Sequence, residues 1–79
     1  MALVTQFESI SKARPKIHQP TRCAYFSFIG DNNQRYFVLE TYGSTDREFP
    51  DKVSQSLQLN ESAARALIKV LRQEFPNLA

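Results

Sequence analysis

The feature that most constrains the fold is the spacing of apolar residues near the C-terminus. Five of them recur at offsets of 0, 3, 4, 7 and 11 residues, which places them along one side of an α-helix. They are Ala64, Leu67, Ile68, Leu71 and Phe75. Asn60 is a good N-cap residue, Glu61 puts negative charge in the first turn, and Pro76 ends the run. A helix with one apolar side must pack on a second layer.

The segments before this helix have the character of strands. Residues 53–59, VSQSLQL, alternate apolar and polar side chains, the period of a half-buried strand. Residues 22–29, RCAYFSFI, and 35–42, RYFVLETY, are rich in aromatic and β-branched residues. The GDNNQ sequence between them supplies turn residues, so the two segments are predicted to form a β-hairpin.

Residues 1–10 fit two patterns. Leu3, Phe7 and Ile10 have helical spacing, whereas Leu3, Thr5, Phe7 and Ser9 would share one face of a strand. We favour the strand, because Val, Thr, Phe and Ile prefer pleated surfaces.

This order of elements predicts one α+β domain. It has a small antiparallel β-sheet of three to four strands and one C-terminal amphipathic helix packed on one face. Within the 79 residues, 1–21 form an N-terminal strand or arm plus a basic connector, 22–59 the antiparallel strands, and 60–76 the helix.

Alternation along the strands predicts two unlike faces. The helix is expected to pack on one apolar set: Phe26, Phe28, Phe37, Leu39, Leu57 and Leu59. The opposite face is expected to carry all three tyrosines and the polar residues of the last strand: Tyr25, Tyr36, Tyr42, Ser54, Ser56 and Gln58.

Positive charge is concentrated in one stretch. The net charge is +2, but residues 1–30 carry +3, mainly from the SKARPKIHQPTR sequence at 11–22. Lys12, Arg14 and Lys16 alternate with other residues, so an extended backbone, which the prolines at 15 and 20 favour, would align them on one side. The alternative is a solvated connector.

A sheet face with tyrosines and basic edges is suited to single-stranded DNA or RNA, because bases stack on aromatic rings and cations neutralise phosphates. The predicted nucleic-acid-binding residues are Lys12, Arg14, Lys16, Arg22, Tyr25, Arg35, Tyr36, Tyr42, Arg47 and Lys52. The alternative is a surface that binds a protein partner or a second copy without nucleic acid. A homodimer is expected for the nucleic-acid-binding protein also, since a chain this short buries only a small hydrophobic core.

The layout of residues 35–71 resembles the single-stranded-DNA-binding transcriptional coactivator family, which comprises positive cofactor four and its bacterial and plant relatives. RYFVLETY, the polar connection GSTDREFPDK, VSQSLQL and an immediately following helix carry the likeness. It implies transcription regulation, pairing through helices, single strands bound in sheet-lined channels, and roles for Arg47 and Lys52. The family's Lys-Gly pair before the third strand is replaced by Val53 and Ser54, and its helix tryptophan is absent.

No catalytic group set is recognisable. His18 and Cys23 lack a third, orienting residue, and the acids Asp46, Glu48 and Asp51 lack the spacing of an EF-hand loop. We expect no enzyme activity, no metal or other cofactor and no small-molecule substrate. The sequence has no secretory signal pattern and no 18-residue apolar run. We therefore expect a cytoplasmic protein that does not interact with membranes.

Overall fold

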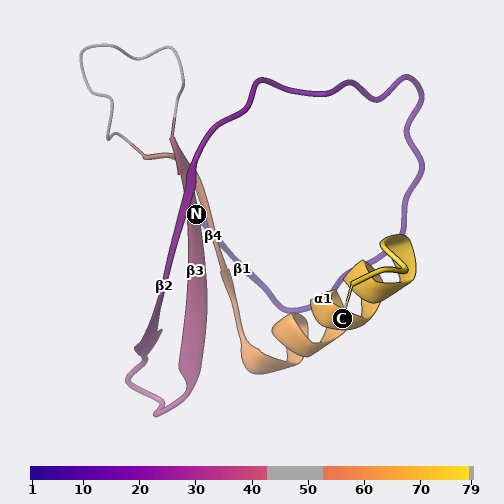
Figure 1. Ribbon diagram of the computed structural model, residues 1–79. Helices are drawn as coiled ribbons and strands as arrows, with labels where there is room; N and C mark the ends of the chain where they lie inside the picture. The colour runs from indigo at the N-terminus through magenta and orange to yellow at the C-terminus, as the bar shows by residue number, and fades with distance from the viewer. Residues whose placement is uncertain (43–52, 79) are drawn as a thin grey trace.

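The computed structural model describes residues 1–42 and 53–78 and confirms the α+β class. Its elements are β1 (Ala2–Val4), β2 (Cys23–Ile29), β3 (Arg35–Tyr42), β4 (Val53–Leu59) and α1 (Glu61–Glu74). The strands form one sheet in the order β1-β4-β3-β2 (Figure 1). The strand favoured for residues 1–10 is confirmed over three residues. Its pairing with β4 is parallel, so the sheet is mostly rather than wholly antiparallel.

The loop between β2 and β3 sets the register of the hairpin. The Gly30 N–H donates to the Gln34 carbonyl at 2.8 Å and the Asn33 N–H to the Gly30 carbonyl at 3.0 Å, which leaves three residues in the loop. Asn33 has a φ of 62°, as expected for the left-handed residue that ends a three-residue hairpin loop. Residues 29 and 35 therefore pair directly, and every other pair of the hairpin follows from them.

This register corrects the predicted faces of the sheet, because directly paired residues lie on the same side. Tyr25 pairs with Leu39, whereas Phe26 pairs with Val38 and Phe28 with Tyr36. The three tyrosines are therefore not on one face, and the two phenylalanines of β2 do not face the helix. Both predictions were wrong for the same reason: they assumed a register shifted by one residue.

We call the two sides of the sheet the helix-side face and the open face. The helix-side face carries Tyr25, Ser27, Ile29, Arg35, Phe37, Leu39, Leu57 and Leu59. The open face carries Ala24, Phe26, Phe28, Tyr36, Val38, Glu40, Ser56 and Gln58. Phe37 and Leu59 line a depression together with Ala64 of α1, which identifies the side on which the helix lies.

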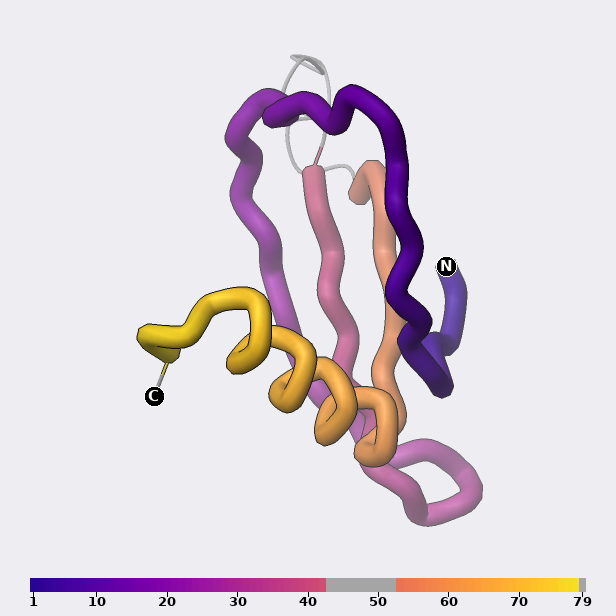
Figure 2. The backbone as a smooth tube through the Cα atoms, turned by 90° about the vertical axis from the view of Figure 1, so that its right-hand side faces the viewer, coloured from indigo at the N-terminus to yellow at the C-terminus, as the bar shows by residue number. Residues whose placement is uncertain are grey.

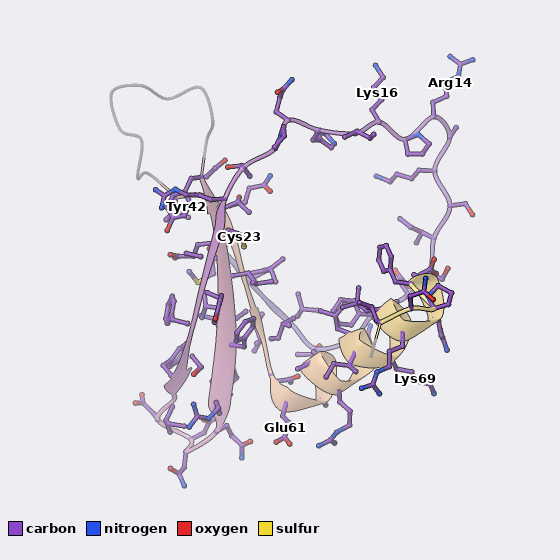
Figure 3. The ribbon with its side chains drawn as sticks, in the orientation of Figure 1. Arg14, Lys16, Cys23, Tyr42, Glu61 and Lys69 are labelled. Carbon is purple, nitrogen blue, oxygen red and sulfur yellow. The ribbon has the colours of Figure 1, made fainter. Side chains whose placement is uncertain are left out.

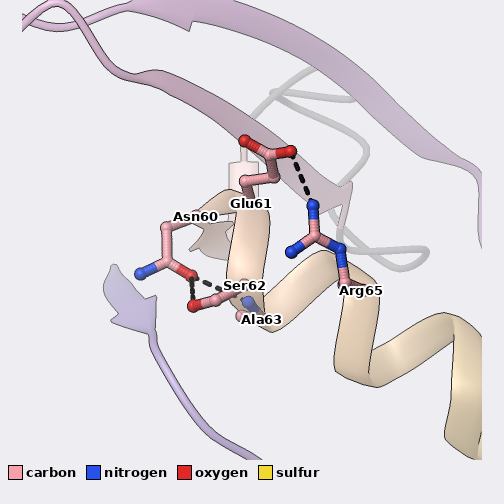
Figure 4. A network of polar contacts seen from close by, with 5 residues as sticks. All are labelled: Asn60, Glu61, Ser62, Ala63 and Arg65. Carbon is pink, nitrogen blue, oxygen red and sulfur yellow. Dashed lines mark hydrogen bonds and ion pairs between the residues drawn. The ribbon is translucent and has the colours of Figure 1, made fainter.

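The predicted start of the helix is confirmed. The Asn60 side chain accepts a hydrogen bond from the Ala63 N–H at 2.8 Å and another from the Ser62 hydroxyl at 3.0 Å (Figure 4). An exposed ion pair, 2.9 Å long, joins Glu61 to Arg65 one turn later. At the other end, Phe75 is the C-cap and Pro76 follows it.

The helix meets the sheet mainly at β4, near its own N-terminus, and then runs away from the strands (Figures 1 and 2). Residues 5–22 form an arch on the same side of the sheet and return to the start of β2. Among the described residues, the buried hydrophobic side chains are only Val38, Leu59 and Ala63. The core within one chain is therefore very small.

Candidate nucleic-acid interface

The open face carries a row of three aromatic rings near the hairpin loop. The ring centroids of Phe26 and Phe28 are 6.4 Å apart, and those of Phe28 and Tyr36 are 5.6 Å apart in a stacked arrangement. Phe26 is 48% exposed and Phe28 38% exposed, although both belong to the sheet. The row is a partly uncovered apolar surface on the side of the sheet opposite the helix.

The hairpin loop holds the last ring of this row in place. The Asn32 side-chain amide donates to the Tyr36 hydroxyl at 2.7 Å. A Cβ atom added at Gly30 would lie 3.0 Å from Cε2 of the same ring, so a larger residue at this position would displace the ring by a few tenths of an ångström. Loop and ring thus fix each other.

Arg22 and Tyr42 form a second cluster at the opposite end of the two strands. The Arg22 guanidinium lies 4.1 Å from the centroid of the Tyr42 ring, which is a cation–π contact. The Thr21 hydroxyl donates to the Tyr42 carbonyl at 2.6 Å and ties the end of the arch to β3. Pairing with β4 is irregular between Thr41 and Tyr42, but Figure 3 shows the Tyr42 side chain on the side of the sheet away from α1, which is also the side of Tyr36.

The basic part of the arch is exposed and lacks regular secondary structure. Arg14 has a φ of 56°, so the uninterrupted extended backbone that we predicted for Lys12, Arg14 and Lys16 is broken at this residue. Figure 3 shows the side chains of Arg14 and Lys16 pointing outward from the arch. The arch therefore offers its positive charge to solvent on the helix side of the sheet, and only its last residues return to the strand end that Arg22 occupies.

Two of the predicted site residues lie on the other side of the sheet. Tyr25 is on the helix-side face, 5.6 Å from Phe37 between ring centroids, and 72% exposed. Arg35 is also on that face, where its guanidinium donates to the Ser27 hydroxyl at 3.0 Å. Arg47 and Lys52 lie outside the described residues.

Sequence reasoning missed the two residues that the open face exposes most clearly, Phe26 and Phe28, because it assigned them to the helix side. The signal that would have found them is Asn33. Asparagine tolerates the left-handed conformation that a three-residue hairpin loop requires, and that loop length alone fixes the register.

The other candidate groups are dispersed. His18 is exposed in the arch. Cys23 is an exposed free thiol whose Sγ lies 3.6 Å from the Ala24 carbonyl. Within residues 1–42 and 53–78 there is no group of three or more His, Cys, Asp or Glu residues placed to hold a metal ion. The acids Asp46, Glu48 and Asp51 fall outside the described ranges. In the same ranges, no helix has both the length and the apolar character needed to span a bilayer.

Comparisons with protein families, with curated proteins and with solved structures find no match to this chain. The resemblance to the coactivator family therefore stays a prediction that depends on the layout of residues 35–71.

Proposed function

We propose that the chain, paired with a second copy, is a non-enzymatic protein that binds single-stranded DNA or RNA on the open face of its sheet. Bases stack on the row formed by Phe26, Phe28 and Tyr36, and the phosphates run toward Arg22 and the basic arch. The observation that supports the proposal is the aromatic row itself, with ring separations of 6.4 and 5.6 Å and both phenylalanine rings partly exposed.

The exposed area gives the expected size of the stacking contribution. A phenylalanine side chain has about 200 Å² of surface. With Phe26 48% and Phe28 38% exposed, about 80–100 Å² of each ring remains to be covered. At about 25 cal/mol per Å², covering one ring stabilises the complex by about 2 kcal/mol. This agrees with the roughly 1–3 kcal/mol that one stacked base contributes in single-strand complexes.

The charges on the open face restrict the path of the phosphates. Glu40 lies on this face and pairs with Ala24, between the aromatic row and Arg22. Its carboxylate repels phosphate, so the nucleic-acid backbone passes beside the sheet and around its Arg22 end to reach the arch, which carries Lys12, Arg14 and Lys16 on the helix side. We place this function in the cytoplasm. The exposed free thiol of Cys23 supports that location, because the cytoplasm is reducing.

The test is fluorescence anisotropy with labelled single-stranded DNA and RNA oligonucleotides. Phe28→Leu keeps an apolar side chain and removes the ring, so we expect about a 2- to 10-fold loss of affinity, corresponding to the roughly 0.5–1.5 kcal/mol that a stacked ring contributes beyond its apolar area. Phe28→Trp keeps a ring and should retain binding. Tyr25→Leu removes a ring on the helix-side face but keeps an apolar side chain there, so pairing is retained and the affinity for oligonucleotides should stay unchanged.

Salt dependence tests the contribution of the arch. Three phosphate contacts on a single strand give a slope of about −2 in log K against log salt, or about a 20-fold loss of affinity between 50 and 200 mM. Lys12→Gln together with Lys16→Gln should reduce the slope by about 1.4. Lys69→Gln, on the outer side of α1, is the matched control. No binding at low salt, or equal binding by wild type and Phe28→Leu, would overturn the proposal and favour a protein-binding surface.

A further inference from the structure

The surface area of the chain is too large for a folded protein of its mass. It exposes 7400 Å², whereas a monomer of 9.1 kDa exposes about 4,900 Å². The excess is about 2,500 Å². The Cα radius of gyration, 15.0 Å, likewise exceeds the roughly 12 Å of a compact domain of this length.

Part of this excess surface is apolar. It lies on two surfaces, both of which are on the helix side of the sheet. The first is the outer part of the apolar stripe on α1 and its C-cap, where three large apolar side chains are exposed: Ile68, Leu71 and Phe75. The second is the helix-side face of the sheet, where Tyr25, Ile29 and Leu57 are exposed. Within the chain these surfaces do not cover each other, because α1 leaves the sheet after its contact with β4 (Figure 1).

We infer that a second copy of the chain covers both surfaces, with the apolar side of each α1 packed on the helix-side face of the partner's sheet. A helix stripe and an uncovered sheet face are the two layers that an α+β domain normally joins. One chain offers one of each, so two copies related by a two-fold axis satisfy both at once. The inference extends the pairing included in the proposed function, but it does not depend on nucleic-acid binding, which uses the open face.

The area and the charges agree with this arrangement. Stable homodimers that fold as a unit bury about 1,000–2,500 Å² on each partner, so the excess surface of this chain is large enough to contain such an interface. The cations of α1, Arg65, Lys69 and Arg72, are spaced along the side away from Leu67 and Leu71, so packing the apolar stripe leaves them in water.

The first experiment measures the mass of the wild-type chain by sedimentation equilibrium and its thermal midpoint at several protein concentrations. We expect a mass of twice 9.1 kDa and a midpoint that rises with concentration, as for any dimer that dissociates on unfolding. A mass of 9.1 kDa at all concentrations, or a trimer or larger assembly, would overturn the inference.

A complementation experiment then distinguishes helix-on-sheet pairing from pairing through helices alone. Leu71→Asp damages the helix stripe and Tyr25→Asp damages the sheet face, so each variant alone should lose the dimer. When the two are mixed, one helix and one sheet face remain intact and can pair, so dimers should reappear. Pairing through helices alone predicts instead that Tyr25→Asp remains dimeric and that mixing rescues nothing.

Two matched controls place the charge elsewhere. Gln73→Asp lies on the polar side of α1 and Phe26→Asp on the open face, and both should keep the mass of the wild-type dimer. Circular dichroism reports whether each variant is folded. If the aspartate variants unfold as monomers, Leu71→Ala and Tyr25→Ala are used instead. Each alanine variant alone should have a lower thermal midpoint than wild type at the same protein concentration. A mixture of the two should recover part of that loss, and a mixture that recovers none of it contradicts the inference.

Discussion

The junction between β4 and α1 allows a stability prediction whose size follows from one side chain. The Asn60 Oδ1 atom accepts hydrogen bonds from the Ala63 N–H and the Ser62 hydroxyl (Figure 4). Ala63 is fully buried, with 0% of its surface exposed, so water cannot replace the lost acceptor. Removing an N-cap side chain costs about 0.5–2 kcal/mol, and a buried donor left without a partner places this case near the upper end.

Asn60→Ala should therefore lower the free energy of unfolding by about 2 kcal/mol. For a chain of this size, the thermal midpoint falls by about 4–8 °C for each kcal/mol. The assay is urea or thermal unfolding followed by far-ultraviolet circular dichroism. All variants are compared at one protein concentration, since pairing makes the midpoint depend on concentration.

Two further substitutions separate capping from other effects. Asn60→Asp keeps an acceptor and adds negative charge at the helix N-terminus, so its stability should stay close to that of wild type. Ser62→Ala removes only an exposed hydrogen bond and should cost much less than Asn60→Ala. The reasoning fails if Asn60→Ala is as stable as wild type, or if Asn60→Asp is as damaging as Asn60→Ala.

Two other stability predictions use the same unfolding assay. Val38→Ala removes two methyl groups from a side chain that is 1% exposed and should cost about 2 kcal/mol, whereas Val70→Ala, at a position 38% exposed, should cost clearly less; equal losses would contradict the burial of Val38. Asn33→Gly should stabilise the hairpin by up to about 1 kcal/mol, and Asn33→Val should destabilise it by about 1–2 kcal/mol, because valine does not tolerate the φ of 62°. A valine variant as stable as wild type would exclude the left-handed conformation at this residue.

The elements were predictable because each has a local cause. Apolar spacing, the Asn60 cap and Pro76 determine the helix, and alternation determines the long strands. The three-residue β1 has only a weak local pattern, and its parallel pairing with β4 depends on contacts between distant parts of the chain.

The faces of the hairpin were not predictable from alternation alone. Alternation divides the residues of one strand between its two sides. It does not show which side of the next strand belongs to the same face of the sheet. That choice depends on loop length, and we identified GDNNQ as a turn without determining which of its residues pair. As a result, Tyr25 was assigned to the wrong side, whereas Tyr36 and Tyr42 were correctly assigned to one face.

The position of α1 away from most of the sheet was also not predictable from the sequence. An amphipathic stripe requires an apolar partner but does not specify whether that partner belongs to the same chain. In the structure only the first part of α1 meets β4, so the stripe that predicted the helix remains largely exposed.

The three-residue turn after β2 makes this small protein sensitive to insertion and deletion. One residue added there, with β3 unchanged, would rotate every side chain of β2 to the opposite side. The two phenylalanines would then point toward the helix, and Tyr25 would join the other tyrosines. The length of the turn, more than the identity of any one aromatic residue, determines which chemical surface each side of the molecule displays.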